Sequence, residues 1–205
     1  MTELEEVHRQ VSTCRDCGLC ERRTHAVPGE GPENAEVMFV GEGLGFNEDQ
    51  QARPFVGPAG RFLDELLGLA GLRREEVFIT NVIKCRPPEN RDPLPDEVEA
   101  CRKYLTRQIE LIRPGLIVTL GRFSLGWFLP KESIGRVHGQ LRAVGGSNIL
   151  PMYHPAAALH AANMRQVIQE DFRRLPEALA RVRQGSVAMS REPVAADVVE
   201  QGRLF

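Results

Sequence analysis

The sequence lacks any apolar run that approaches the ~20 residues of a membrane-spanning helix. Its first six residues are largely acidic and polar, and no apolar segment follows them, so we expect neither a secretory signal nor a transmembrane helix. A strong net charge is also missing: 26 cationic residues, only 3 of them Lys, stand against 28 acidic ones, which gives −2. This balance excludes a polycation that coats nucleic acid, but it leaves room for a local basic face.

The chain has 205 residues, which is enough for one domain and a remainder. Hydrophobic residues make up 42% and charged residues 26%, as in an ordinary globular protein that buries a core without covalent staples. From Gly185 to Gly202 the apolar patterning is weak and Ser, Pro and Glu recur. We therefore expect a single domain over residues 1–183 and a mobile C-terminal tail over residues 184–205.

Four short apolar segments predict buried strands, at residues 36–41, 77–83, 115–121 and 148–153. Apolar residues at three- and four-residue steps predict helices over residues 58–70, 96–112 and 164–183, with a short helix around 125–128. Because strands and helices alternate, the pattern indicates an α/β fold, with a mainly parallel four-stranded sheet between layers of helices.

Five cysteines in a chain without a secretory signal favour a metal or cluster site over disulfides. Cys14 and Cys17 form a C-x2-C pair, and Cys85 and Cys101 come from two further segments. Four thiolates in this arrangement suit structural zinc and an iron–sulfur cluster equally, and coincidental buried cysteines are a third alternative. Cys20 is either a substitute for Cys17 or an ordinary small apolar residue.

Unusual residues follow three of the predicted strands. Glycine-rich residues 41–45 follow the first strand, Asn81 lies at the end of the second, and His154 follows the fourth. Ligands of open parallel sheets bind beyond the carboxyl ends of the strands, so these positions predict a site at one sheet edge, with Phe55 from a turn-rich stretch nearby. Each feature has a structural alternative. The glycines would then form only a tight turn and Asn81 would only cap a loop, while His154 would be an ordinary strand-end histidine and Phe55 a core residue. No Gly-Lys-Ser/Thr follows the glycines, and no nucleophile elbow is present.

Four motifs in order resemble those of the family 4 uracil-DNA glycosylases, iron–sulfur enzymes of bacteria and archaea. The motifs are Gly-Glu-Gly-Leu-Gly at 41–45, Arg-Pro-Phe-Val-Gly at 53–57, Thr-Asn-Val-Ile-Lys-Cys-Arg-Pro-Pro at 80–88 and His-Pro at 154–155. The resemblance covers roughly residues 10–180. It implies a three-layer α/β/α fold, and a 4Fe-4S cluster held by Cys14, Cys17, Cys85 and Cys101. Departures from the family pattern include Leu44, where the family usually has Pro, and Phe46 and Asn47, where acidic residues are frequent.

The resemblance also implies an activity, the removal of uracil from DNA during base excision repair. A glycosylase flips its target base into a pocket. Phe55 would stack on uracil, Asn81 would read its Watson–Crick edge, and His154 would donate to O2 as negative charge develops there. Backbone amides of the glycine-rich turn, at Gly43 and Gly45, would bind uracil or position water. Glu42 and Glu48 would be supporting carboxylates. At Gly43 some other branches carry a water-activating Asp.

Further expectations concern partners. Residues 101–142 hold eight Lys and Arg and two Glu, which predicts a phosphate-facing surface, with Arg86 and Arg91 as additional candidates. A solvated helix face is the alternative for residues 102–113. Residues Gln201–Phe205 resemble the short motif by which bacterial repair proteins bind the replication sliding clamp. We expect a cytoplasmic, nucleoid-associated monomer with no membrane contact, and the competing hypothesis is a non-catalytic DNA- or clamp-binding module of the same fold. A cross-linking glycosylase is disfavoured because residues 86–95 contain no His.

Overall fold

The computed structural model describes residues 1–185. Four strands are mutually parallel: β1 (Val37–Gly41), β2 (Phe78–Asn81), β3 (Leu116–Leu120) and β5 (Ser147–Met152). A short strand, β4 (Arg142–Val144), pairs with β5 in the antiparallel sense, and the sheet order is β2-β1-β3-β5-β4. The prediction of a mainly parallel sheet is confirmed, with one strand more than expected.

The additional strand β4 is an edge strand of three residues. Val144 pairs with Ser147, so Gly145 and Gly146 form a two-residue hairpin turn, with φ of +52° and +82°. Such positive φ values suit glycine and the tight turns that match the strand twist. A segment of three residues is too short to show an alternating pattern, which is why the sequence analysis did not predict this strand.

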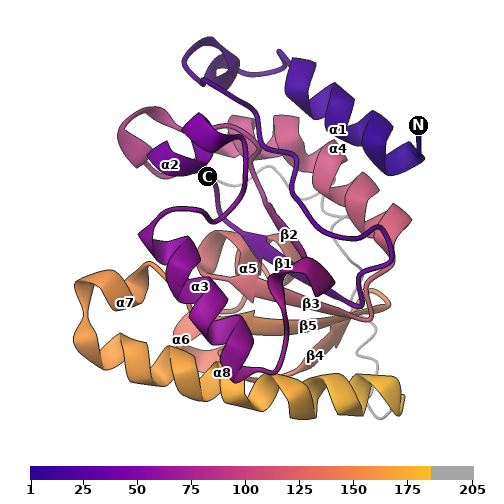
Figure 1. Cartoon of the computed structure of the whole chain (residues 1–205), viewed down its shortest axis with the longest axis vertical. Coiled ribbons are helices and arrows are strands. Elements are labelled where there is room, and N and C mark those ends of the chain that lie inside the picture. The colour runs from indigo at the N-terminus through magenta and orange to yellow at the C-terminus, as the bar shows by residue number, and fades with distance from the viewer. Residues whose placement is uncertain (186–205) are drawn as a thin grey trace.

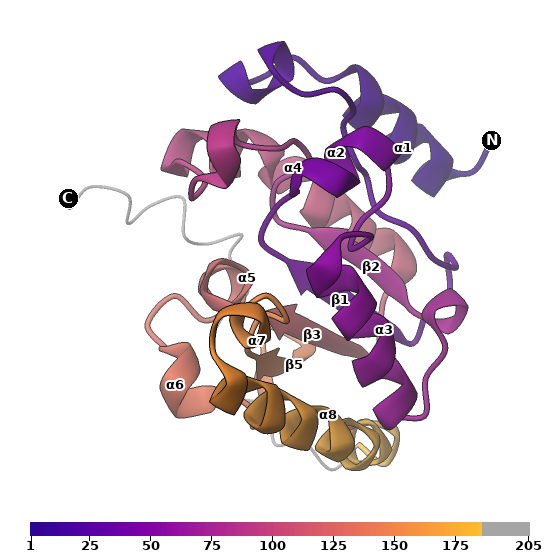
Figure 2. The ribbon, with the colours of Figure 1, turned by 60° about the vertical axis from the view of Figure 1, so that its left-hand side comes forward.

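Helices cover both faces of the sheet (Figures 1 and 2). One face carries α1 (Glu3–Thr13), α4 (Pro95–Ile112) and α5 (Arg122–Phe128), and the other carries α3 (Pro58–Leu69) and α8 (Ala162–Arg183). Alternate residues of a strand point to opposite faces. The sheet therefore contributes to two separate cores, and the three-layer α/β/α arrangement is the one expected.

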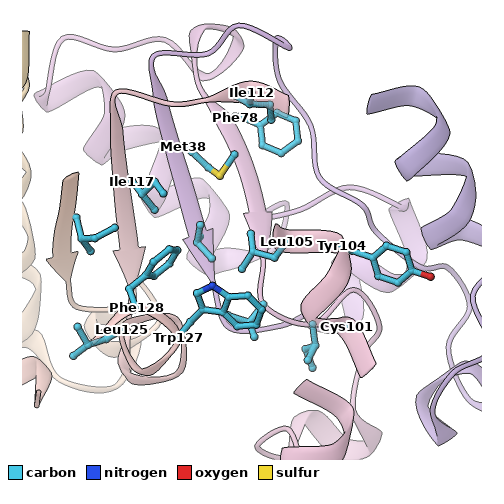
Figure 3. Packing of buried hydrophobic residues seen from close by; sticks show 14 of the residues in the cluster. Met38, Phe78, Cys101, Tyr104, Leu105, Ile112, Ile117, Leu125, Trp127 and Phe128 are labelled. Atoms are coloured by element: carbon cyan, nitrogen blue, oxygen red, sulfur yellow. The ribbon is translucent and has the colours of Figure 1, made fainter. Parts of the chain in front are cut away.

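The core beneath α4 and α5 extends to the carboxyl-terminal edge of the sheet (Figure 3). Met38 and Ile117 of the sheet lie in the same cluster as Leu105 of α4 and Trp127 of α5. Cys101 also belongs to this cluster, and it lies near the start of α4. Because α4 runs back over the parallel strands, its first turns lie at the edge where the strands end, and Cys101 is placed there.

Four of the described helices, two of them only four residues long, were not predicted from the sequence. The first, α1, begins with a capping box in which Thr2 Oγ1 accepts from Glu5 N at 3.1 Å and Glu5 Oε2 accepts from Thr2 N at 2.7 Å. The second, α2 (Phe46–Gln51), follows the glycine-rich residues directly. The shorter elements are α6 (Ile134–Val137), α7 (Ala157–His160) and three single turns, η1 (Gly18–Glu21), η2 (Arg74–Glu76) and η3 (Pro88–Asn90).

Helix α8 ends at Arg183, which is where the expected domain ends. Residues 186–205, which make up nearly all of the expected tail, lie outside the described residues. Among the described helices, none combines the length and the apolar character that a bilayer crossing requires.

Candidate active site

A cavity of about 420 Å³ opens beyond the carboxyl ends of the parallel strands. Its wall comes from four segments, which lie within residues 42–48, 55–59, 83–91 and 154–159. The volume falls in the range of small-molecule sites, about 300–1,000 Å³. The structure thus brings together most of the predicted site residues, namely Glu42, Gly43, Gly45, Glu48, Phe55 and His154.

Phe55 occupies a left-handed backbone conformation, with a φ of +50°. This costs a non-glycine residue about 1–3 kcal/mol, so neighbouring groups must hold it in place. Gly60 in α3 leaves room for the Phe55 carbonyl, because a Cβ at position 60 would overlap that oxygen. Arg74 Nη1 donates to the same oxygen at 3.1 Å, and its Nη2 donates to the Pro54 oxygen at 2.5 Å. The aromatic ring is therefore a preorganised part of the pocket wall.

Glu48 joins the glycine-rich loop to the Phe55 turn. Its Oε1 accepts from Val56 N at 2.9 Å and Gly57 N at 2.8 Å, and its Oε2 accepts from Gly45 N at 3.1 Å. Three backbone donors thus use both oxygens of this buried carboxylate. These contacts give Glu48 a positioning role, and they engage the Gly45 N–H that was a candidate for contacting a ligand.

His154 follows β5 and lies beside Phe55. Its Nδ1 accepts a hydrogen bond from Ala156 N at 3.1 Å, so the proton of a neutral ring resides on Nε2. Burial lowers the pKa of His154 to about 4, although the charge of Glu48 acts in the opposite direction. At neutral pH the residue is therefore an uncharged imidazole with one N–H donor.

Asn81 ends β2 and is 1% exposed. Within the described part of the chain, its Oδ1 is buried without a hydrogen-bond partner, which is costly for an amide oxygen. A Cβ on Gly41 would overlap this oxygen and would approach the Phe55 ring to 2.7 Å, so glycine at position 41 lets all three groups meet. The Asn81 side chain does not line the open cavity; it lies next to the residues that do.

Glu42 lines the cavity and titrates near neutrality. Burial and, to a smaller extent, the charge of Asp92 raise its pKa to about 7, against the opposing charge of Arg122. Asp92 and Arg122 also form an ion pair with each other, which joins the loop after β2 to α5. A carboxyl group with such a pKa can exchange protons near physiological pH.

Gly43 has little room for a side chain. A Cβ there would lie 2.8 Å from Cγ1 of Ile83 and 2.9 Å from its Cδ1. A carboxylate at this position would therefore have to displace Ile83. The carboxylates of this pocket wall are therefore those of Glu42 and Glu48, and position 43 supplies none.

The five cysteines are free thiols, of which Cys85 and Cys101 are buried. Burial, together with the charges of Cys101 and Cys17, raises the pKa of Cys85 to about 11 against the hydrogen bond and charge of Arg23. Burial likewise raises the pKa of Cys101, with Cys17 and Cys14 adding to the effect. The four predicted ligands thus lie within electrostatic reach of one another. Among residues 1–185, however, no three His, Cys, Asp or Glu side chains converge tightly enough to hold a single metal ion.

The family model of the uracil DNA glycosylase superfamily matches residues 28–177. The chain belongs to this superfamily. It is 50% identical to the Type-4 uracil-DNA glycosylase of Saccharolobus solfataricus over 190 residues, which cover 88% of either chain. It is 44% identical to the Type-4 enzyme of Thermotoga maritima, over 82% of this chain and 90% of the relative. The resemblance inferred from the four motifs is thus confirmed.

A more distant likeness joins this member of the superfamily to the Type-5 uracil-DNA glycosylase of Thermus thermophilus. The two are 31% identical over 62% of this chain and 68% of the relative. Relatives of both types carry the name of a glycosylase, which favours an enzyme over the competing hypothesis of a non-catalytic binding module.

Three basic residues of α4 form ion pairs within this superfamily member. Arg102 pairs with Glu99 at 2.7 Å, Lys103 with Asp16 at 2.5 Å, and Arg107 with both Glu3 and Glu110. Two of these pairs, with Asp16 and Glu3, join α4 to the N-terminal segment, and the phosphate-facing surface stays a prediction. Arg91 lines the cavity and is also ion-paired with Glu97 at 2.6 Å, and the Arg86 guanidinium lies 5.3 Å from the centre of the Phe46 ring.

Two residues that shape the pocket escaped the sequence analysis. Gly60 could be noticed in the sequence, because it follows the Gly-Pro pair at the start of α3. The sequence does not show, however, which group approaches it in space. Arg74 has no such signal, because its acceptors belong to residues 54 and 55, about twenty positions earlier in the chain.

Proposed function

We propose that this protein excises uracil from DNA by hydrolysing the N-glycosidic bond, which leaves an abasic site for base excision repair. The observation that carries the proposal is the buried Asn81 amide, which lies beside the residues that line the cavity and whose Oδ1 has no hydrogen-bond partner among residues 1–185. Uracil presents N3–H as a donor and O4 as an acceptor, and a carboxamide supplies both complements. Cytosine reverses both groups, so each mismatched, buried polar group would cost about 1–3 kcal/mol.

Phe55 and His154 provide the rest of the base site in this proposal. The fixed ring of Phe55 stacks on the extruded base, and His154 Nε2–H donates to uracil O2. As the glycosidic bond breaks, negative charge develops on the base, and a donor that is already oriented stabilises it. A neutral imidazole is sufficient for this, in keeping with the low pKa that burial gives His154.

Water must then add to the oxocarbenium-like sugar. We assign orientation of this water to the carboxylate of Glu42, because its pKa near 7 makes it a proton acceptor under physiological conditions. Gly43 contributes its backbone, without a side chain, to the part of the cavity wall that would face uracil. Glu48 acts through Gly45 and the Phe55 turn, whose amides it binds.

The thiols of Cys14, Cys17, Cys85 and Cys101 fit a 4Fe-4S cluster. Four soft sulfur donors from three segments influence one another electrostatically. The donor set alone suits zinc as well, and the resemblance to the iron–sulfur glycosylases is what favours the cluster. When bound, the cluster would join the N-terminal segment to the loop after β2, which carries Arg91 to the cavity. Cys20 is left out of the ligand set because the motif resemblance assigns the cluster to the other four cysteines.

The test uses oligonucleotides that carry uracil, cytosine or thymine at one position, with alkali to cleave abasic sites. Wild-type protein should cleave the uracil strand alone, and the Asn81→Ala and His154→Ala variants should lose most of this activity. Binding without any uracil-dependent product would favour the non-catalytic module. Iron analysis and the visible absorption of the same preparation test the cluster, and a colourless, zinc-loaded protein would reject it.

Sliding-clamp binding through residues 201–205 is a separate proposal, which rests on the sequence motif, since these residues lie outside the described part of the chain. Deletion of residues 201–205 should abolish clamp capture and spare uracil excision. Unchanged capture would refute it. A monomer in the nucleoid is the assembly and location that we propose, and sedimentation of the purified protein tests the former.

A further inference from the structure

Arg23 contacts two of the cysteine-bearing segments directly. Its Nη1 lies 2.9 Å from Cys85 Sγ, and its Nη2 donates to the Cys14 carbonyl at 2.8 Å and the Ser12 carbonyl at 3.2 Å. The side chain is partly buried, whereas its neighbour Arg22 is exposed. One guanidinium thus joins the end of α1, the C-x2-C segment and the loop after β2, although Cys85 lies 62 positions away in sequence.

The chemistry of arginine suits this place. A guanidinium keeps its charge at any pH that a folded protein tolerates, and its planar fork holds several acceptors in fixed directions. Hydrogen bonds from charged donors are roughly twice as strong as neutral ones. A thiolate at position 85 would therefore be a better acceptor for Arg23 than the neutral thiol, and metal binding would strengthen the contact.

We propose that Arg23 is a positioning residue of the cysteine site, where it donates to the ligand sulfur of Cys85 and fixes Cys14 at the right separation. The inference rests on the proposed 4Fe-4S cluster. Residues that hydrogen-bond to metal ligands orient them, and removal of such residues typically weakens metal binding 10- to 100-fold. A cation hydrogen-bonded to a ligand sulfur also stabilises the reduced, more negative cluster, and so raises its reduction potential.

A purely structural role would affect retention of the cluster but not its potential. Without the cluster, Arg23 would still join two carbonyls to Cys85 and stabilise the N-terminal segment. The reduction potential reports the charge and hydrogen bond at the sulfur itself, so it separates the two roles.

The experiment compares the intact wild-type chain with Arg23→Gln, Arg23→Lys and the matched control Arg22→Gln. Three quantities are measured on each: the rate at which visible absorption is lost in the presence of an iron chelator, the reduction potential, and uracil excision. Arg23→Gln should lose iron about 10- to 100-fold faster and have a lower potential. Arg23→Lys keeps the charge and should recover part of the potential, and Arg22→Gln should match the wild type.

Equal potentials in all four proteins would overturn the role of Arg23 at the sulfur, even where Arg23→Gln loses iron faster. A wild-type protein without iron would overturn both the cluster and the role of Arg23, and uracil excision by the same preparation would then show that the glycosylase assignment stands separately. If Arg23→Gln does not fold, Arg23→Lys decides: a potential identical to that of Arg22→Gln, together with unchanged iron loss, contradicts the proposal.

Discussion

The ring of Phe55 lies against the imidazole of His154, with 5.5 Å between the ring centroids and 27° between the planes. The two residues come from distant parts of the sequence, and each is fixed by its own contacts. Arg74 and Glu48 bind the Phe55 turn, Gly60 leaves room for it, and the Ala156 amide binds His154. The geometry between the proposed platform and the proposed donor is therefore set before any base enters, as preorganised catalysis requires.

Substitution of Gly60 tests how strongly the Phe55 turn is constrained. Gly60→Ala should destabilise the protein by about 1–3 kcal/mol and lower uracil excision, because the new Cβ would overlap the Phe55 carbonyl. Gly68→Ala in the same helix is the matched control, because a Cβ there would meet no atom of the described residues within 4 Å. This substitution should raise the free energy of unfolding by about 0.5–1 kcal/mol through helix propensity. Urea unfolding measures both, and equal stabilities would contradict the strained turn.

Substitution of Asn81 tests the reading of uracil. In Asn81→Ala two groups of uracil would be buried without partners, which should lower the single-turnover rate roughly 10- to 100-fold for each lost hydrogen bond. Asn148→Ala is the control, since Asn148 lies at the start of β5 and binds the Gly115 carbonyl at 3.0 Å. A rate for Asn81→Ala that matches the rate of the control would refute the assignment.

Stability at mildly acidic pH should depend on His154. Because burial lowers its pKa from 6.5 to about 4, the unfolded chain binds a proton that the folded chain refuses within that window. The free energy of unfolding should therefore fall as the pH drops from 6.5 to about 4, by about 1.4 kcal/mol per pH unit. His154→Gln should lose this contribution and the exposed His160→Gln should retain it, as urea unfolding at several pH values would reveal. An identical pH slope in both variants would exclude His154 as the source.

The rate of excision should rise with pH through about 7, as Glu42 becomes ionised. Glu42→Gln should be slower and lack this limb. Asp92→Asn should move the limb to lower pH, because the Asp92 charge raises the pKa of Glu42, and Arg122→Gln should move it to higher pH. Single-turnover rates across the pH range measure all four proteins. A limb that persists in Glu42→Gln would assign it to another group of the pocket.

Cysteine variants should separate the ligands from the spare thiol. Cys101→Ala should lose most of the bound iron, since Cys101 is one of the four proposed ligands and is buried among them. Cys20→Ala should keep the iron content and visible absorption of the wild type. Loss of iron in Cys20→Ala with retention in Cys17→Ala would mean that Cys20 replaces Cys17 as a ligand.

The sequence predicted the elements that carry long, regular patterns. The buried strands around Phe39, Ile79 and Val118 and the helix at 95–112 were all recognisable, because continuous apolar runs and three- or four-residue steps need no knowledge of distant partners. Helices α1, α2, α6 and α7 were missed. Helix α1 had a visible start signal in Thr2 and Glu5, whereas α2 has only six residues and α6 and α7 have four each. The three-residue β4 gave no pattern to detect.

The sequence by itself determined the family, the order of the strands along the chain, and which residue types end the strands. Three of its candidates, Glu42, Phe55 and His154, line one cavity. Only the tertiary structure decided their states: that backbone amides bind Glu48, that His154 is a neutral imidazole, and that the Asn81 oxygen has no hydrogen-bond partner among residues 1–185. The cations of α4 were likewise assigned to ion pairs by the fold. The reason is physical. A residue's identity fixes which hydrogen bonds it can donate or accept, but burial and long-range neighbours decide its charge and which of its donors and acceptors stay unpaired.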